Sequence, residues 1–264
     1  MTDGTTQHPD AGEAPRVLVV QHEDRVPLAR WAEAPGLELV VIRPDRGDPV
    51  PADLAGYAGL IVLGGTMAAW EDDVAPWLPA TRALLATAVD DATPVLGICL
   101  GAQLLAMATG GTVEKGPDGP ELGVVPVTVQ PGAREDRLLR RAGQTFPAPQ
   151  GHHDAITRLP RGAVLLASSE AYPHQAFRLG ENAWGVQYHP EADHDTFEDW
   201  MLGDAEALAA TGRTPDAVMV EFDSHEPDLA TASAAHLDAF VDIVIQARTS
   251  SVGAHRAAQV VGRR

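Results

Sequence analysis

The sequence predicts an α/β protein built on a doubly wound, mainly parallel β-sheet that is flanked by helices and extended by antiparallel strands. In the first half of the chain, short runs rich in valine, isoleucine and leucine alternate with helix-forming segments. Buried parallel strands have continuous apolar runs of this kind, and strands that alternate with helices build parallel sheets. After residue 122 the chain turns into short β-rich pieces separated by turns. We expect these pieces to form the antiparallel extension.

The first half of the chain contains four apolar runs of strand length, and the segments between them have helix or loop patterns. The third run ends in a pair of glycines, the composition of a sharp turn where backbone approaches a ligand. The expected strands cover residues 16–20, 37–44, 59–65 and 94–98. The expected helices cover residues 24–34 and 75–90, and a third begins at residue 100 and is stopped by glycines at 110 and 111. Residues 45–54 are rich in Pro, Gly and Asp and are expected to form a loop.

The second half is expected to complete one domain and to end in a helical extension. Strands are predicted over residues 123–129, 163–169, 174–180 and 183–191, with a hairpin turn at 180–182, and helices over residues 194–210 and 228–248. The predicted organisation is a disordered polar lead over residues 1–15, a domain over 16–211, and a C-terminal helical extension and tail over 212–264.

Composition restricts the function classes. The 264 residues carry 37 acidic and 19 basic side chains, for a formal net charge of −18. Such a charge repels phosphate backbones and anionic lipid surfaces, so we expect no nucleic-acid partner. No apolar run approaches the roughly 20 residues that span a bilayer, and the N-terminus lacks the pattern of a signal peptide. We therefore expect a cytoplasmic protein without a membrane role.

The single cysteine, Cys99, lies where a predicted buried strand meets a predicted helix, with glycines two residues away on both sides. Such glycines permit the tight turn of a nucleophile elbow, and the N-terminus of the following helix stabilises the reactive thiolate. The amide N–H of Leu100, with one from the turn at Gly64 and Gly65, is expected to form an oxyanion hole. The alternative is a buried, inert cysteine. The flanking glycines at a strand-to-helix junction favour the nucleophile.

His189 is the expected base for this cysteine. It is followed two residues later by Glu191, and in an extended segment alternate residues share a face. The glutamate is therefore placed to accept a hydrogen bond from one imidazole nitrogen while the other nitrogen faces the thiol. The alternative is an edge-strand histidine with a chance acidic neighbour, and the presence of Cys99 favours the catalytic interpretation.

The remaining polar motifs do not indicate a metal or a nucleotide cofactor. His152, His153 and Asp154 are adjacent in the chain but lack the helical spacing of a zinc site. A substrate-contacting loop is the better interpretation, because binding residues often lie on loops between rigid strands. No Gly-x-Gly-x-x-Gly follows a strand and no P-loop is present. We expect neither a metal site nor a cofactor.

Together these residues resemble the class I glutamine amidotransferases. Two motifs carry the resemblance, Gly-Ile-Cys-Leu-Gly-Ala-Gln over residues 97–103 and Gln-Tyr-His-Pro-Glu over residues 187–191. They occur in this order and follow a strand that ends in Gly-Gly. The similarity covers roughly residues 16–205 and is greatest to stand-alone proteins similar to the amidotransferase domain of GMP synthase.

The resemblance implies a role for each motif residue. Cys99 is implied to be the nucleophile, His189 the general base and acid, and Glu191 the residue that orients His189. The amides of Gly65 and Leu100 are implied to form the oxyanion hole. The implied substrate contacts are Gln103, His152 and Asp154. Two positions depart from the family pattern. His153 stands where a glycine is common, and Thr66 follows the Gly-Gly turn where the synthase domains have proline. Both changes affect the expected shape of the site where substrate binds. They do not affect the resemblance to the family.

The implied activity is hydrolysis of the glutamine side-chain amide through a γ-glutamyl thioester, which releases ammonia. Because no other part of the chain resembles a synthase domain, the ammonia acceptor is expected on a separate partner protein. One alternative is a stand-alone γ-glutamyl peptidase or amidase that uses the same triad. Another is a catalytically inactive regulatory subunit, against which the intact triad argues.

Overall fold

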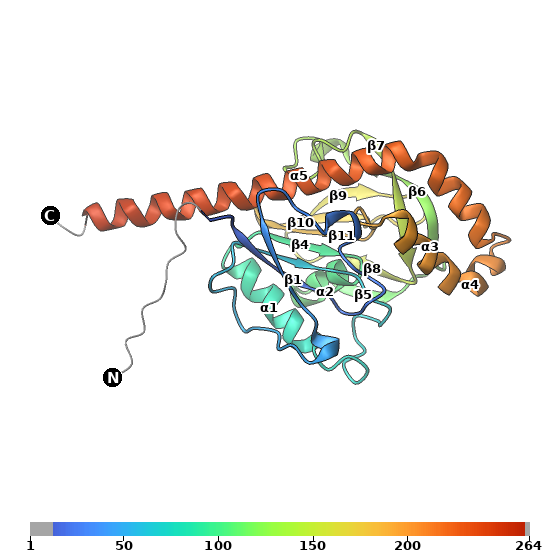
Figure 1. Cartoon of the computed structure of the whole chain (residues 1–264), viewed down its shortest axis with the longest axis horizontal. Helices are drawn as coiled ribbons and strands as arrows, with labels where there is room; N and C mark the ends of the chain where they lie inside the picture. Colours follow the sequence, from blue (N-terminus) through green and yellow to red (C-terminus); the bar gives the residue numbers. More distant parts are fainter. Residues whose placement is uncertain (1–12, 262–264) are drawn as a thin grey trace.

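The computed structural model describes residues 13–261, and the side chains of residues 13–249 among them. Its centre is a mixed nine-stranded sheet in the order β2-β1-β3-β4-β11-β10-β9-β6-β7, with helices on both faces (Figure 1). The strands of this sheet are β1 Arg16–Val20, β2 Glu38–Ile42, β3 Gly59–Val62, β4 Val95–Ile98, β6 Glu121–Val129, β7 Thr145–His152, β9 Val164–Ser168, β10 Ala176–Leu179 and β11 Ala183–Val186.

The sheet has a parallel part and an antiparallel part, which confirms the predicted fold class. Strands β2, β1, β3, β4 and β11 pair in parallel. From β11 the pairing through β10, β9, β6 and β7 is antiparallel. A separate antiparallel ribbon is formed by β5 Thr112–Lys115 and β8 Asp154–Arg158. The carboxyl ends of β3, β4 and β11 meet at one edge, where Gly64, Cys99 and Gln187 follow.

Side chains of the parallel strands alternate between two cores, as the pleat of a strand requires. On one face, Leu18 and Val62 pack in a cluster with residues of α1 Leu78–Asp90 and α2 Leu100–Ala108. On the other face, Val19 and Ile61 pack in a cluster that includes Phe240 of the last helix. The protein is thus a three-layer structure, with α1 and α2 on one side of the sheet and a long helix on the other (Figure 1).

That long helix, α5 Pro215–Val261, extends well beyond the predicted helix over residues 228–248. It continues through Pro227, although proline usually interrupts a helix. Phe222, on the N-terminal side of this proline, is fully buried against Phe197 of helix α3 His194–Gly203, with the two rings stacked and their centroids 4.9 Å apart. This packing explains why the helix begins earlier than the pattern suggested. In Figure 1, α5 crosses the whole sheet and continues past its edge.

Several predicted elements were wrong in kind or extent. The predicted helix over residues 24–34 is only a 3₁₀ turn, η1 Ala29–Trp31, in which Ala29 has a positive φ of 44°. The predicted strand over 183–191 ends at Val186, because the chain then bends away from β4 and the amide of His189 donates to the carbonyl oxygen of Pro149 in β7. The predicted helix over 194–210 is broken at Asp204 into α3 His194–Gly203 and α4 Ala205–Ala210. Strands β5, β7 and β8 were not predicted, since proline and polar residues obscure their alternation.

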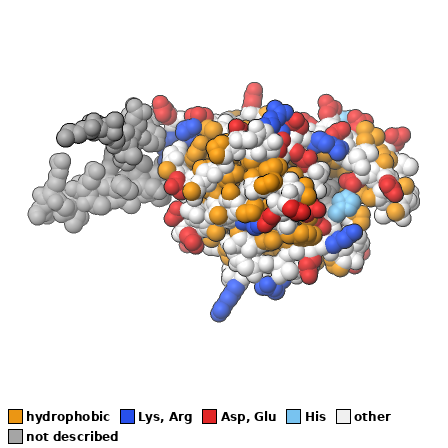
Figure 2. Space-filling view, turned by 90° about the horizontal axis from the view of Figure 1, so that it is seen from below, with side chains coloured by type: hydrophobic (Ala, Val, Ile, Leu, Met, Phe, Trp, Pro, Cys, Tyr) orange, Lys and Arg blue, Asp and Glu red, His pale blue; other side chains and the backbone are white. Residues whose placement is uncertain are grey.

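The remaining features of the fold concern the ends of the chain, its helices and its surface. Most of the predicted disordered lead, residues 1–12, and the last residues of the tail, 262–264, lie outside the described residues. The predicted domain boundaries remain a prediction. None of the described helices combines the length and hydrophobicity that crossing a bilayer requires. Figure 2 shows acidic side chains spread over one face of the molecule, with hydrophobic side chains gathered toward its centre.

Candidate active site

Cys99 lies in a sharp turn between β4 and α2 and has the strained backbone angles of a nucleophile elbow. Its φ is +49° and its ψ is −107°, a region that non-glycine residues rarely occupy. Two glycines make the turn sterically possible. A Cβ on Gly97 would lie 2.5 Å from the carbonyl oxygen of Gly101, and a Cβ on Gly101 would lie 2.0 Å from that of Val62. The amide of Cys99 donates to the carbonyl oxygen of Val186 at 2.8 Å, which ties the elbow to β11.

The sulfur and the imidazole of His189 approach each other across Gly64. A Cβ on Gly64 would lie 2.9 Å from Cε1 of His189 and 3.5 Å from the Cβ of Cys99. Only glycine therefore leaves room for the thiol and the base to meet at this point. The side-chain amide of Gln187 also donates to the Cys99 sulfur, at 3.5 Å.

His189 and Glu191 form a buried ion pair. The distance between Nδ1 of His189 and Oε1 of Glu191 is 2.7 Å, and their side chains are 3% and 0% exposed. Burial opposes the charged imidazole, but the charges of Glu191 and Cys99 and hydrogen bonds to both raise the pKa of His189 from 6.5 to about 10. A protonated imidazole beside the sulfur stabilises a thiolate. The pair forms in a turn beyond β11, not in the extended strand that was predicted.

Two backbone amides beside Cys99 are free to bind an anion. Among the described residues, neither the N–H of Leu100 nor that of Gly65 donates a hydrogen bond to another group. Leu100 is the first residue of α2, whose N-terminus favours negative charge. The two residues are neighbours in space, because a Cβ on Gly65 would lie 2.8 Å from Cδ2 of the Leu100 side chain.

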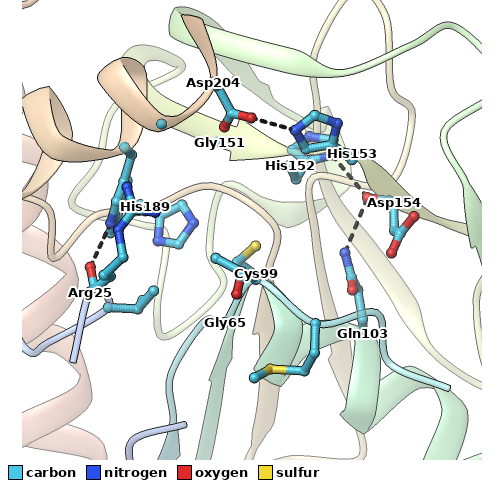
Figure 3. A pocket seen from close by; sticks show the side chains of 15 residues that line it. Arg25, Gly65, Cys99, Gln103, Gly151, His152, His153, Asp154, His189 and Asp204 are labelled. Atoms are coloured by element: carbon cyan, nitrogen blue, oxygen red, sulfur yellow. Dashed lines mark hydrogen bonds and ion pairs between the residues drawn. The ribbon is translucent and has the colours of Figure 1, made fainter. Parts of the chain in front are cut away.

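A small cavity of about 260 Å³ opens over Cys99 (Figure 3). In Figure 3, His189 and Arg25 lie on one side of Cys99, while Gln103 and Asp154 lie on the other. Fifteen residues line the cavity: Arg25, Val26, Gly65, Thr66, Met67, Cys99, Gln103, Gly151, His152, His153, Asp154, His189, Trp200, Gly203 and Asp204. The cavity is therefore built from segments that lie far apart in the chain.

The three predicted substrate contacts all line this cavity, but they differ in what they offer. Gln103 donates through Nε2 to the carbonyl oxygen of Asp154 at 3.1 Å and to Oε1 of Gln187 at 3.2 Å. His152 is buried, and its ring nitrogens contact the Asp154 carbonyl oxygen at 2.9 Å and a Glu121 carboxylate oxygen at 3.0 Å. The Asp154 carboxylate is partly buried, and burial chiefly raises its pKa. Substrate contact by these residues remains a prediction.

Sequence patterns did not indicate the residues that come from the first turn and from α3. Trp200 lies against the catalytic candidate, with its ring centroid 4.4 Å from that of His189, and its Nε1 donates to the carbonyl oxygen of Arg25 at 2.6 Å. Arg25 donates to Asp199 through Nε and through one terminal nitrogen. His153 contacts Asp204 across the cavity mouth. Of these residues, only His153 belongs to a motif that the sequence analysis singled out. Arg25, Trp200 and Asp204 belong to none, so only their meeting in space identifies them.

A metal site finds no support in the geometry. Within the part of the chain that the structure describes, no group of three or more His, Cys, Asp or Glu side chains is arranged to hold a metal ion. The expectation that the site needs no cofactor remains a prediction.

Comparison with known proteins agrees with this geometry. The family model for class I glutamine amidotransferases matches residues 28–205, which include the elbow and the His-x-Glu pair. The chain belongs to this family. The resemblance in the two sequence motifs is thereby confirmed.

Individual relatives of this amidotransferase chain include long enzymes and much shorter proteins. A GMP synthase from Porphyromonas gingivalis is 37% identical over 58% of this chain, which corresponds to 29% of that protein. One of the subunits of glutamine-hydrolysing GMP synthase from Sulfolobus acidocaldarius is 35% identical over 60% of this chain and 79% of that protein. Gamma-glutamyl peptidase 4 from Arabidopsis thaliana is 32% identical over 57% of this chain and 60% of that protein. The chain thus matches less than a third of the full-length synthase.

The fold is shared with solved amidotransferases. The crystal structure of a glutamine amidotransferase from Thermotoga maritima superposes with a TM-score of 0.77 at 25% identity, over 88% of this chain and 99% of that one. The match includes most of the described structure.

Proposed function

We propose that this amidotransferase chain is a glutaminase, which hydrolyses the side-chain amide of glutamine at Cys99 and supplies ammonia to an acceptor on a separate protein. The observation that carries the proposal is that Cys99, His189 and Gly65 line one cavity, with Glu191 bound to His189 and the free amide of Leu100 next to Cys99 in the chain. This combination provides a nucleophile, a proton carrier and an anion site, the parts that acyl transfer requires.

In the first half of the reaction, the Cys99 thiolate attacks the amide carbon and the carbonyl oxygen becomes an oxyanion. The N–H groups of Gly65 and Leu100 stabilise this charge. His189, held protonated by Glu191, donates its proton to the leaving nitrogen. The C–N bond breaks, ammonia departs, and a γ-glutamyl thioester remains on Cys99.

In the second half, neutral His189 takes a proton from water, which attacks the thioester carbon. The same two amides stabilise the second oxyanion. Collapse of this intermediate breaks the C–S bond and restores the thiolate beside a protonated His189. The new γ-carboxylic acid loses its proton to water and leaves as glutamate. Glu191 keeps the imidazole in one orientation throughout, because its carboxylate binds Nδ1.

The size and charge of the cavity suit an amino acid. About 260 Å³ is less than the roughly 300–1,000 Å³ of pockets that hold drug-sized ligands. His189 must face the leaving nitrogen, so the glutamyl part extends to the opposite side of Cys99, toward Gln103 and Asp154 (Figure 3). We assign the partly buried Asp154 carboxylate to the α-ammonium group of glutamine.

The partner is proposed from the relatives. The Sulfolobus acidocaldarius relative is by its name one of the subunits of a glutamine-hydrolysing GMP synthase, and this chain matches 79% of its length. A synthase that is divided into subunits can hold its glutaminase and its ammonia acceptor on separate polypeptides. We extend that arrangement to this chain without naming the acceptor.

The test is ammonia release from glutamine by the purified protein beside its Cys99→Ala variant. Release that requires the cysteine supports the proposal. To separate a partner-dependent enzyme from an inactive one, both proteins are also treated with a diazoketone analogue of glutamine, and the mass of the Cys99 peptide is measured. Wild-type protein that neither turns over glutamine nor becomes labelled would overturn the glutaminase function and favour the regulatory alternative.

A second candidate function, hydrolysis of γ-glutamyl peptides, is favoured by Arg25. This arginine lies on the His189 side of the cavity, where the leaving group must sit (Figure 3). Asp199 occupies its Nε and one terminal nitrogen, and guanidinium has further N–H donors in the same fork. A leaving amino acid has a carboxylate that these donors can bind. The similarity to a γ-glutamyl peptidase agrees with this candidate.

Arg25→Met distinguishes the two functions. If leaving groups with a carboxylate are natural substrates, the variant loses about tenfold in kcat/KM for γ-glutamylglycine, in line with loss of one charged hydrogen bond, and keeps its value for glutamine. Arg16→Met, which removes an exposed arginine of β1, is the control. Equal losses on both substrates would assign Arg25 to the structure of the cavity rim instead.

A further inference from the structure

The carboxylate of Glu23, which lies outside the cavity, accepts two hydrogen bonds from the turn that carries the Gly65 amide. Glu23 lies in the segment after β1 and does not line the cavity. Its Oε1 accepts the backbone N–H of Thr66 at 2.5 Å, and its Oε2 accepts the Thr66 hydroxyl at 3.1 Å. Both donors of the residue that follows Gly65 are therefore bound by a single side chain.

The Gly64-Gly65 turn needs such an external restraint. Glycine adopts many backbone conformations, so two in succession fix the orientation of their own peptide groups only weakly. A Cβ at Gly65 would lie 2.6 Å from the Met67 sulfur and 2.8 Å from a methyl carbon of Leu100, so a stiffer residue there would displace both of these side chains. The last strand hydrogen bond before the turn is the one from Leu63 to the carbonyl oxygen of Val20. Beyond the glycines, the contact with Glu23 is the next anchor.

We infer that Glu23 is a positioning residue, which holds the Gly65 amide in the orientation that binds the oxyanion; this inference rests on the glutaminase function proposed above. Glu23 itself is tied to the sheet, since Gln21 donates through Nε2 to its carbonyl oxygen at 2.9 Å and through its backbone to Ile42 at 3.1 Å. A hydrogen bond to a charged acceptor is shorter and stronger than one between neutral groups. The Gly65 N–H belongs to the Gly64–Gly65 peptide, which lies between the strand hydrogen bond of Leu63 and the Thr66 N–H that Glu23 holds. Loss of the contact with Glu23 frees one end of this short turn, so that the Gly64–Gly65 peptide can rotate and turn the Gly65 N–H away from the sulfur.

This role affects the transition state and not the binding of substrate. The oxyanion forms only after attack, so a misplaced Gly65 amide lowers kcat and leaves KM nearly unchanged. Loss of a complete oxyanion donor lowers kcat by about 10²–10³. A donor that is present but no longer held is expected to lower kcat by about tenfold to a hundredfold.

The experiment compares wild type with Glu23→Ala, Glu23→Gln and the control Glu33→Ala, which alters an exposed acid on a nearby turn. For glutamine, Glu23→Ala should lower kcat by about tenfold or more with KM within about twofold. Glu23→Gln keeps an oxygen acceptor for the Thr66 N–H and should fall between wild type and Glu23→Ala. Glu33→Ala should behave as wild type.

Two further measurements separate positioning from general damage. Glutamate γ-semialdehyde forms a tetrahedral adduct with Cys99 that needs the oxyanion hole, and its affinity, measured by calorimetry, should fall in Glu23→Ala by the same factor as kcat. Alkylation of Cys99 by iodoacetamide needs no oxyanion hole, and its rate should not change. An unchanged kcat and aldehyde affinity, or an alkylation rate that falls with them, would overturn the inference. Wild-type protein that neither turns over glutamine nor is labelled by the diazoketone would refute the proposed function alone, because the aldehyde and alkylation measurements still report on Glu23.

Discussion

His153 reaches across the mouth of the cavity to Asp204, with 2.8 Å between its Nε2 and a carboxylate oxygen. The contact joins the turn between β7 and β8 to the break between α3 and α4. It exists because His153 stands at a position where the motif implies a glycine, which has no side chain to make it. The hydrogen bond that His153 donates to the Asp204 carboxylate, opposed in part by burial, raises the pKa of His153.

The first prediction concerns this pair. In an NMR titration, His153 should show a pKa above 6.5, and Asp204→Asn should lower it. A raised folded-state pKa means that the stabilisation is complete below 6.5 and is lost as pH rises through the folded value. The difference in Tm between wild type and Asp204→Asn should therefore be greatest in mild acid and vanish at alkaline pH. The control is Asp195→Asn, which removes the charge of the fully exposed partner of His194. An unchanged pKa of His153 in the Asp204→Asn variant would contradict the prediction.

The second prediction concerns the strain at Cys99. At ordinary positions glycine is about 0.5–1 kcal/mol less stable than alanine, whereas a strained non-glycine residue costs about 1–3 kcal/mol. Because Cys99 has a φ of +49°, Cys99→Gly should be at least as stable as Cys99→Ala in urea unfolding. The control is Ala83→Gly on the exposed face of α1, which should lose about 1 kcal/mol. Greater stability of Cys99→Ala would show that the elbow stores little strain.

The third prediction concerns the close approach of α2 to β3. A Cβ on Gly101 would lie 2.0 Å from the carbonyl oxygen of Val62, a backbone atom that cannot rotate away. Gly101→Ala should therefore lose about 3 kcal/mol of unfolding free energy and should abolish turnover. Gly132→Ala adds the same methyl group where no atom lies within 4 Å, and it should change stability by less than about 0.5 kcal/mol. Similar losses for the two variants would refute the steric explanation.

The fourth prediction concerns the His189–Glu191 pair. Glu191→Gln removes the charge that holds the proton on His189, and kcat should fall by about 10³–10⁴, as for the acid of a Ser-His-Asp triad. With a folded pKa of about 10 against 6.5 unfolded, the pair stabilises the protein fully below pH 6.5 and loses this effect as pH rises toward 10. The destabilisation by Glu191→Gln should therefore be larger at pH 7 than at pH 10. Equal destabilisation at the two pH values would mean that His189 is already neutral at pH 7.

Strands β1, β3 and β4 of the parallel part were predictable because they are buried on both faces, which makes each of them a continuous apolar run. Strand β11 was expected in the antiparallel extension, and this was wrong, because it pairs in parallel with β4. The antiparallel part was harder to predict. Strand β7 carries Pro147 and Pro149 and pairs with Pro126 of β6, so neither strand shows clean alternation. The 3₁₀ turn at residues 29–31 was mistaken for a helix because its pattern is apolar. In the structure, the backbone N–H of Arg30 donates instead to the carbonyl oxygen of Glu191.

The sequence by itself determined the family, the parallel core, the elbow around Cys99 and the pairing of His189 with Glu191. These features depend on glycine spacing, on apolar runs and on residues two apart, all of which are local in the chain. Only the tertiary structure decided which distant groups complete the site, namely Arg25, Trp200 and Asp204 at the cavity and Glu23 behind the Gly65 turn. No local pattern marks them, because each acquires its role from the segment against which the fold packs it.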